Sequence, residues 1–345
     1  MRAVVLERGE LSLADIPEPL PGRRHLLARP LACGICGSDL HAVDAPAAMA
    51  DLQAEVDASA PHSPLRGPRT GPADSVVLGH EFCAEVVEVG GDVSGFMPGD
   101  VVVSVPRLFD DAGRRHTLGY SSSVPGGLAE LMLIDADVAL HVPPGVEPWA
   151  AALTEPLAVA ARAVNRSAIT PGQSAVVFGC GPIGLGVVAQ LRARGAGLIV
   201  AIDPSPARRA LAEVLGADLA VEPDGFEPGA LPAVPPPVMF DAVGAPGMLD
   251  RIVLMAPART HVVVVGACFQ ADTWRPMLAL GRELTLSFVM AYSDDEFAST
   301  LEWIGGGAFD ASVFVSARLP LSEAIDGFDR LRHPVGDAKV LVVAS

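Results

Sequence analysis

The stretch Val176-Val177-Phe178-Gly179-Cys180-Gly181-Pro182-Ile183-Gly184 decides the fold of this chain, because it joins an apolar run to the pattern Gly-x-Gly-x-x-Gly. The apolar run predicts a buried strand, and a helical pattern begins directly after it. In that setting Gly179 makes a tight turn, Gly181 lets the backbone approach a pyrophosphate, and Gly184 lets the helix pack closely on the strand. The stretch therefore predicts a dinucleotide-binding turn; an ordinary strand–turn–helix connection is the alternative.

Residues just beyond the turn suit the binding of the phosphates and the adenosine ribose of a dinucleotide. Pro182 and Ile183 start the helix whose N-terminus would face the phosphates. Asp203 ends the next apolar run, about twenty residues on, where an acid bonds the adenosine ribose hydroxyls. A carboxylate there repels a 2′-phosphate, so the sequence favours NAD over NADP, although Arg208 could tolerate that phosphate.

From about residue 171, apolar runs of strand length alternate with helical patterns, which predicts a doubly wound parallel sheet. Val243 and Gly266 follow two of these runs and are expected to line the nicotinamide pocket at the carboxyl ends of the strands. The predicted strands are 175–178, 198–202, 219–221, 238–242, 261–265 and 284–288, and the predicted helices are 182–194, 206–216, 247–256 and 274–281.

The first 142 residues have a different pattern. Short apolar runs separated by Gly and Pro turns favour a compact, partly closed β domain, and an Ala-rich helical pattern follows at 143–170. After residue 289, helical segments and a final strand at 339–343 are expected to return to the first domain. We therefore expect a β catalytic domain at 1–150, a Rossmann NAD-binding domain at 151–289 and the returning segment at 290–345.

Cys36 and the pair His80-Glu81 supply a thiolate, an imidazole and a carboxylate, which are ligand types that hold Zn²⁺. Cys33 and Cys36 also form a C-x-x-C pair, which would suit a redox site or a zinc knuckle. A knuckle needs a second ligand pair at regular spacing, and none follows. A redox pair would leave His80-Glu81 unexplained, so we favour a metal site.

These residues carry a resemblance over nearly the full length of the chain. The sequence resembles the zinc-dependent medium-chain alcohol dehydrogenases, closest in pattern to their polyol dehydrogenase branch, and the resemblance implies a GroES-like β domain beside the Rossmann domain. The matching stretches are Cys36-Gly-Ser-Asp-x-His41, Gly79-His80-Glu81, Pro98-Gly99-Asp100-Val101-Val102, Gly126-Gly127-Leu128-Ala129-Glu130, Glu155-Pro156-Leu157 and the glycine turn with Asp203.

The resemblance implies roles for four residues at the metal. Cys36 and His80 are expected to be ligands of a catalytic zinc. Glu81 is either a direct ligand or a close partner of one, and Glu155 stands where the family supplies its remaining ligand. Whether Glu81 or Glu155 binds the metal directly is left open by the sequence, and an ordinary acidic residue in the first turn of a helix is the alternative for Glu155.

The resemblance also implies a route for the alcohol proton and a contact to the coenzyme. Ser38 is expected to accept the proton and pass it through the nicotinamide ribose to His41, whose ordinary pKa of about 6.5 suits release to solvent. Lys339 begins the final strand, and the family places a basic residue just before that strand on the coenzyme pyrophosphate. It is also the single lysine of the chain, and a solvated charge at the strand end is the alternative.

Two departures from the family pattern change the expectations. Residues 104–125 contain no cysteine, so the lobe that binds a structural zinc in many members is missing and one zinc per chain is expected. The segment 42–78 is longer than usual and rich in Ala and Pro. We expect a helix within 42–60 and an irregular loop at 61–75, either a solvated excursion or a flap over the substrate cleft.

Composition excludes several function classes. The formal charge of −17 disfavours nucleic acid and acidic membrane surfaces as partners. The sequence has no apolar run of about 18–20 residues and no signal-peptide pattern at its start. Five scattered cysteines argue for thiols in a reducing compartment, so a cytoplasmic location is expected.

The favoured hypothesis is an NAD- and zinc-dependent oxidoreductase that transfers a hydride between NAD and a small-molecule alcohol, which could be a secondary alcohol, a polyol or a sugar-like compound. The alternatives are a zinc-free, NADPH-dependent reductase of enones or quinones on the same fold, and a catalytically silent dinucleotide sensor. A homodimer or homotetramer is expected, with Ser312–Val315 as a candidate edge strand.

Overall fold

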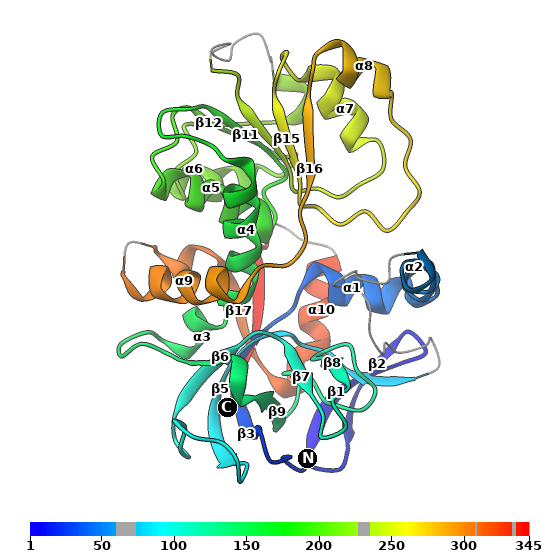
Figure 1. The fold of residues 1–345 in the computed structure, drawn as a ribbon, viewed down its shortest axis with the longest axis vertical. Coiled ribbons are helices and arrows are strands. Elements are labelled where there is room, and N and C mark those ends of the chain that lie inside the picture. The colour runs from blue at the N-terminus through cyan, green and yellow to red at the C-terminus, as the bar shows by residue number, and fades with distance from the viewer. Residues whose placement is uncertain (60–73, 227–234, 308, 333–335, 345) are drawn as a thin grey trace.

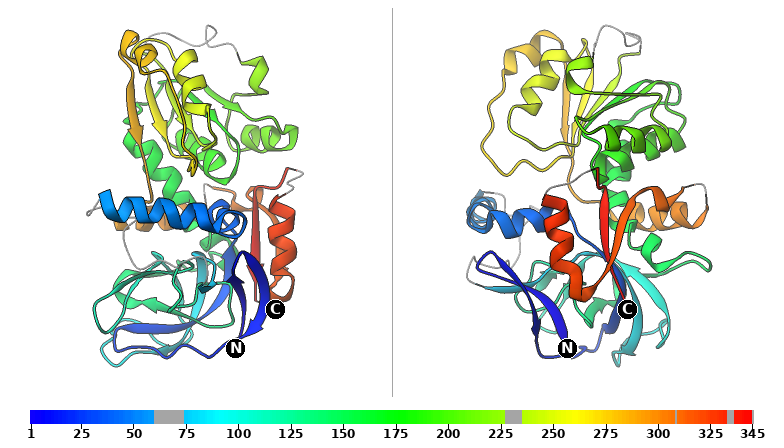
Figure 2. Two further views of the ribbon diagram at one scale, coloured as in Figure 1. Left: turned by 90° about the vertical axis from the view of Figure 1, so that its right-hand side faces the viewer. Right: turned by 180° about the vertical axis from the view of Figure 1, so that it is seen from behind.

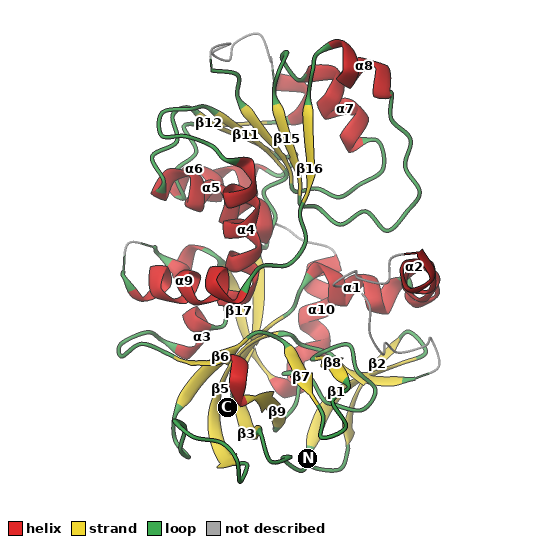
Figure 3. Cartoon of the chain, in the orientation of Figure 1, coloured by secondary structure: helices red, strands yellow, loops and turns green. Residues whose placement is uncertain are grey.

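A computed structural model describes residues 1–59, 74–226, 235–307, 309–332 and 336–344. The chain forms two lobes, with β-rich structure at one end and a parallel sheet covered by helices at the other (Figures 1 and 3). Most of the loop expected at 61–75 lies outside the described residues. None of the described helices is long and apolar enough to cross a membrane.

The N-terminal lobe is built around a seven-stranded sheet in the order β10-β6-β5-β3-β18-β17, with β9 also paired to β3. A three-stranded sheet in the order β2-β1-β4 and the hairpin β7-β8 pack beside it. The strands of this lobe are β1 (Arg2–Glu7), β2 (Glu10–Asp15), β3 (His25–Gly34), β4 (Ser75–Val77), β5 (Glu81–Val89), β6 (Val101–Ser104), β7 (Arg107–Phe109), β8 (Arg115–Thr117), β9 (Met132–Asp135), β10 (Ala139–His141), β17 (Val315–Pro320) and β18 (Lys339–Val343).

The second lobe holds a six-stranded parallel sheet in the order β13-β12-β11-β14-β15-β16. Its central strands β11, β12 and β14 are buried along their whole length and apolar up to Asp241 at the end of β14, because helices cover both faces of the sheet. The strands are β11 (Ala175–Phe178), β12 (Ile199–Ile202), β13 (Leu219–Val221), β14 (Val238–Asp241), β15 (His261–Val264) and β16 (Thr285–Phe288). The predicted Rossmann fold is confirmed, with strand ends that differ by one residue or none.

Local sequence signals explain where the helices start. Pro182 occupies the first turn of α5, Ser205 caps α6 by accepting a hydrogen bond from the backbone of Arg208, and Ser293 and Glu296 form a capping box on α9. The helices are α1 (Gly37–Asp44), α2 (Pro46–Ser59), α3 (Pro148–Ala151), α4 (Thr154–Ser167), α5 (Pro182–Ala193), α6 (Pro206–Val214), α7 (Met248–Met255), α8 (Pro276–Gly281), α9 (Asp294–Gly305) and α10 (Ala324–Arg332).

The C-terminal segment returns to the first lobe, where β18 pairs antiparallel with β3 and parallel with β17. Figure 2 shows α10 beside β18 on the far side of the molecule, with α1 and α2 between the two lobes. The expected edge strand at Ser312–Val315 is wrong. Residues Ala311–Val313 form a 3₁₀ turn because the Asp310 side chain accepts a hydrogen bond from the Ser312 backbone, and the edge strand β17 begins only at Val315.

Candidate active site

Three potential metal ligands meet between the start of α1 and the start of β5. One ligand atom from each of Cys36, His80 and Glu81 lies within 4.8 Å of the other two. Gly79 allows this approach, since it has φ +100° and a Cβ there would sit 2.7 Å from Cys33 Sγ and 2.8 Å from the Leu128 nitrogen. A sulfur donor on partly buried Cys36 and nitrogen and oxygen donors on buried His80 and Glu81 match the chemistry of a zinc site, so these residues could hold that ion.

Asp39, in the first turn of α1, orders two of these groups. Its Oδ2 accepts a hydrogen bond of 2.9 Å from the Cys36 backbone, and its Oδ1 lies 3.4 Å from His80 Nδ1. His80 Nδ1 is buried and makes no hydrogen bond, so its contact with Asp39 is an electrostatic one. Burial opposes a charged imidazole, but the Asp39 carboxylate outweighs it and raises the pKa of His80 well above its usual value. A carboxylate in this position orients a metal-binding histidine.

Lys339 has a different contact from the one expected. Its Nζ lies 2.7 Å from both carboxylate oxygens of Glu81 and donates a third hydrogen bond of 3.2 Å to the Ile35 carbonyl. Both side chains of the pair are 1% exposed. Burial opposes the ammonium, but Glu81 keeps the pKa of Lys339 above its usual value. The predicted contact with the pyrophosphate is therefore corrected, because all three protons of this ammonium are already engaged.

Glu155, in the first turn of α4, is a partly buried carboxylate close to this group. Its Oε1 accepts a hydrogen bond of 2.9 Å from the Tyr292 hydroxyl, on the segment that leads back from the parallel sheet to α9. Burial raises the pKa of Glu155 to about 7, while the charge of His80 opposes the rise and that of Glu81 adds to it. Glu155 is outside the group of three ligand atoms.

Ser38 and His41 both lie on α1, directly after Cys36. The Ser38 Oγ accepts a hydrogen bond of 2.6 Å from the Tyr120 hydroxyl. Burial, together with the charge of Asp39, raises the pKa of Tyr120 well above its usual value. The exposed His41 ring lies 4.7 Å, centroid to centroid, from the ring of Phe269, which follows β15 in the other lobe.

The glycine turn has the shape expected of a dinucleotide site. Gly179 has φ +90°, and a Cβ on Gly184 would collide with the Gly179 carbonyl oxygen, whereas a Cβ on Gly181 would meet nothing within 4 Å. Asp203 is buried at the end of β12, where its carboxylate accepts hydrogen bonds of 2.8 Å from the backbones of Cys180 and Ser205.

The other predicted coenzyme residues lie around that turn. A Cβ on Gly179 would lie 3.0 Å from a methyl carbon of Val243, so Val243 is next to the turn. The backbones of Gly244 and Gly266 are in close contact with each other. The Arg208 guanidinium donates to the Asp337 carbonyl oxygen at 3.1 Å and 3.3 Å, so in this structure it holds the C-terminal segment.

The residues 104–125 that lack cysteine hold a network of side chains instead. His116, 3% exposed, has Nδ1 at 3.0 Å from Ser121 Oγ and Nε2 at 3.2 Å from Asp110 Oδ2. Asp110 also bonds Arg114 across the turn of the β7-β8 hairpin. Among the described residues, the group of Cys36, His80 and Glu81 is the one with metal-ligand spacing.

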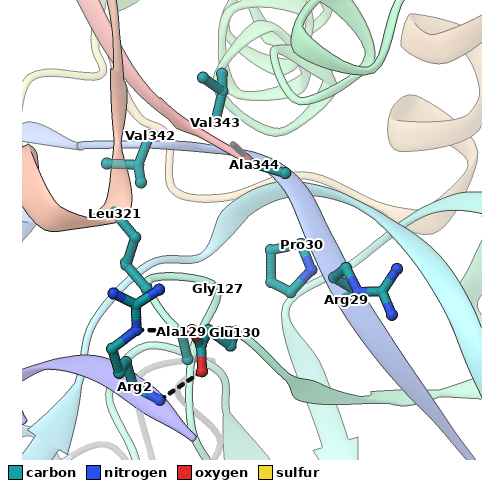
Figure 4. Close-up of a pocket in the computed structure, with 10 residues that line it drawn as sticks. All are labelled: Arg2, Arg29, Pro30, Gly127, Ala129, Glu130, Leu321, Val342, Val343 and Ala344. Carbon is teal, nitrogen blue, oxygen red and sulfur yellow. Dashed lines mark hydrogen bonds and ion pairs between the residues drawn. The ribbon is translucent and has the colours of Figure 1, made fainter.

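A cavity of about 300 Å³ lies at the far end of β18, away from Lys339 (Figure 4). None of the residues that lines it belongs to the candidate site. Its lining residues are Arg2, Arg29, Pro30, Gly127, Ala129, Glu130, Leu321, Val342, Val343 and Ala344.

Tyr120, Tyr292 and the orienting role of Asp39 were not predicted from the sequence. Asp39 could have been noticed, because it stands three residues after Cys36, at the N-terminal end of a helix. The two tyrosines reach the site from positions 82 and 137 residues distant from their hydrogen-bond partners, and no local pattern marks them.

Comparisons with known proteins agree with this arrangement. Residues 22–144 match the alcohol dehydrogenase GroES-like domain, and residues 182–305 match the zinc-binding dehydrogenase domain. The chain is 31% identical over 350 residues to (R,R)-butanediol dehydrogenase of Bacillus subtilis, with 96% of each chain covered. It is 26% identical to human sorbitol dehydrogenase, covering 96% of this chain and 93% of that protein.

Solved structures give the same result. The crystal structure of 2R,3R-butanediol dehydrogenase from Bacillus subtilis matches with a TM-score of 0.83 and 28% identity, covering 100% of this chain and 99% of that one. A zinc-binding dehydrogenase of Sinorhizobium meliloti solved with NADP matches with a TM-score of 0.82 and 28% identity, covering 99% and 98%. The zinc-free reductase alternative is not favoured by these relatives. The chain is an oxidoreductase that belongs to the zinc-dependent medium-chain alcohol and polyol dehydrogenases.

Proposed function

We propose that this chain is an NAD-dependent dehydrogenase with one catalytic zinc, acting on a secondary alcohol of a diol, polyol or sugar-like substrate. The observation that carries the proposal is the grouping of Cys36, His80 and Glu81, with the Ser38 hydroxyl on the adjoining turn of α1. The butanediol and sorbitol dehydrogenases among the relatives support a substrate with more than one hydroxyl.

Cys36 and His80 hold the metal in this proposal, together with one carboxylate. Glu81 stands closer to them than Glu155, but its charge is already balanced by Lys339. A zinc ion bound there supplies Lewis acidity, which lowers the pKa of the alcohol hydroxyl. The Asp39 carboxylate faces His80 Nδ1 at 3.4 Å and would orient the ring by its charge, and the His80 and Glu81 side chains are buried.

The protein must also remove the alcohol proton, while NAD takes the hydride. Ser38 accepts the proton at Oγ and releases its own proton toward the nicotinamide ribose. His41 is exposed and delivers the proton to solvent. Val243 and Gly266, at the carboxyl ends of β14 and β15, would adjoin the nicotinamide if NAD were bound.

NAD is proposed as the coenzyme because Asp203 presents a buried carboxylate at the ribose position. The pyrophosphate would lie over Gly181 at the N-terminus of α5, where space remains for it. Replacing Asp203 with Ala should reduce the ratio of kcat/KM with NAD to kcat/KM with NADP. An unchanged ratio would show that the ribose role is assigned wrongly.

Measurement of zinc content together with a substrate panel tests the central proposal. The wild-type protein should contain about one zinc per chain and reduce NAD with polyols or secondary alcohols. Cys36→Ala should lose the zinc and the turnover, while the NAD dissociation constant stays within a few-fold. Full turnover without Cys36 would contradict the ligand assignment. A metal-free wild type that reduces enones with NADPH would favour the reductase, and NAD binding with no turnover on any alcohol would favour a sensor.

We also propose that the chain forms a homodimer or homotetramer in which the parallel sheet continues between subunits. Among the described strands, β16 pairs in its sheet with β15 alone, so its other edge is open. Large apolar side chains around it are exposed, namely Met277 and Leu280 at 71% and Phe288 at 69%. Light scattering should give a dimer or larger, and Phe288→Lys should shift it to the monomer. A cytoplasmic location fits this proposal because a reducing compartment keeps Cys36 a free thiol.

A further inference from the structure

Tyr120 joins the two polar side chains that follow Cys36 on α1. Its hydroxyl lies 2.6 Å from Ser38 Oγ and 3.3 Å from Asp39 Oδ1, and its ring lies 5.2 Å from the His80 ring. The backbone holds it there rigidly: Gly119 has φ +82°, and a Cβ on Gly119 would be 3.0 Å from the backbone of Gly79. The tyrosine is thus fixed to the same turn that presents His80.

The Tyr120 hydroxyl is the donor in both of its contacts, at 2.6 Å to Ser38 Oγ and at 3.3 Å to Asp39 Oδ1. A tyrosine hydroxyl has one proton, and oxygen–oxygen hydrogen bonds are favourable at about 2.5–3.0 Å. The shorter bond, to Ser38, is therefore the stronger of the two, and the contact with Asp39 is the weaker.

A serine hydroxyl has one proton and two acceptor lone pairs. The bond from Tyr120 uses one lone pair of Ser38 Oγ, so one lone pair remains for a substrate hydroxyl and one proton remains to leave. We propose that Tyr120 is a positioning residue that gives Ser38 this single direction of proton transfer. The inference rests on the proposed function, in which Ser38 accepts the alcohol proton.

The proton balance of the step is simple. The alcohol O–H bond breaks as a new O–H bond forms on Ser38, and the original Ser38 proton is released in the direction of His41 and solvent. NAD, when bound, would accept the hydride from the same carbinol carbon, so the alcohol would be oxidised and NAD reduced. Tyr120 keeps its proton throughout, and its hydrogen bond stabilises the negative charge that develops on Ser38 Oγ during the transfer.

A double-mutant cycle tests the proposal, because a residue that acts through Ser38 must lose its effect when Ser38 is gone. Tyr120→Phe removes one oxygen and should lower kcat by about 10- to 100-fold, the usual effect of losing a hydrogen bond to a developing charge. In the Ser38→Ala background the same change should alter kcat by less than about two-fold. Tyr292→Phe is the matched control, since it removes the other tyrosine hydroxyl of the site, the one on Glu155, and should keep its full effect in that background.

Three readouts besides turnover separate positioning from damage to the fold. Zinc content, melting temperature and the inhibition constant of an unreactive tertiary alcohol should change little in Tyr120→Phe. Equal losses of kcat in both backgrounds, or an unchanged kcat in the single variant, would overturn the proposal. If Ser38→Ala itself kept full turnover, the relay and this inference would both be wrong while the zinc assignment stood. A wild type inactive on every alcohol would overturn the proposed function and the inference with it.

Discussion

Replacing Glu155 with Gln should stabilise the metal-free protein at alkaline pH. Glu155 is partly buried near Glu81, and this environment raises its pKa from 4.5 to about 7. A carboxyl group whose pKa is raised by folding binds its proton more tightly in the folded state. Its contribution to stability is therefore full below pH 4.5 and is lost as the pH rises through about 7. Glutamine has nearly the same shape, stays neutral, and still accepts the hydrogen bond from Tyr292.

The size of the effect follows from the difference between the two pKa values. A rise from 4.5 to about 7 is about 2.5 units, and each unit corresponds to about 1.4 kcal/mol. At pH 8 the ionised Glu155 should therefore cost the metal-free fold at most about 3 kcal/mol, a cost that Glu155→Gln removes. For a lobe of this size that difference amounts to a rise in melting temperature of up to about 10 °C.

Melting curves of chelator-treated protein at pH 5 and pH 8 provide the assay. The increase in melting temperature caused by Glu155→Gln should be small at pH 5 and clear at pH 8. The increase should shrink or reverse when zinc is restored, because the metal favours the ionised carboxylate. Glu302→Gln, which removes an exposed carboxylate on α9, is the control and should show no such pH dependence. A variant that is equally stabilised at both pH values, or destabilised at pH 8, would refute the argument.

Four further substitutions probe other parts of the structure. Lys339→Met should destabilise the metal-free protein by about 3–5 kcal/mol, since it leaves Glu81 buried without a counter-charge, and zinc should restore part of the loss in melting experiments; equal losses with and without zinc would contradict this. Gly184→Ala should lower the stability of the Rossmann lobe. Gly181→Ala should change the stability by about 1 kcal/mol or less, but it should weaken NAD binding by more than tenfold in a titration. Similar stabilities of the two variants would show that the turn is not tight. His116→Leu should lower stability by about 1–3 kcal/mol in urea unfolding with zinc content unchanged; loss of zinc would link this network to the metal.

Sequence periodicity predicted the parallel sheet well because each of its strands is set by local signals. The apolar runs that end before Gly179 and Asp203 predict strands without any knowledge of what packs against them. The β lobe was harder to delimit. The apolar run from Leu128 to Ile134 forms a strand only from Met132 on, because the residues before it bond to β1 and to the Gly79 turn. Tertiary contacts there override local preference.

The ligand group was predictable from residue type, whereas the side chains that tune it were not. Cys36 and His80 are marked by their chemistry and by motifs in the sequence. Tyr120 and Tyr292 are ordinary tyrosines whose hydroxyls matter only because the fold brings them to Ser38 and Glu155. For Lys339 the sequence predicted the wrong partner. Its position suggested a contact with the coenzyme, whereas its side chain binds the Glu81 carboxylate.

The contact between Lys339 and Glu81 follows from two strand registers that meet at Gly34, the last residue of β3. One register pairs Gly34 with Glu81 on β5, and the other pairs Gly34 with Leu341 on β18, two residues beyond Lys339. A Cβ on Gly34 would collide with Glu81 Oε2, so only glycine leaves room for the carboxylate to reach the ammonium. Because β18 comes from the end of the chain, the charge balance of the metal site depends on the C-terminal segment being in place. Folding of that segment and readiness of the site for its metal are therefore coupled.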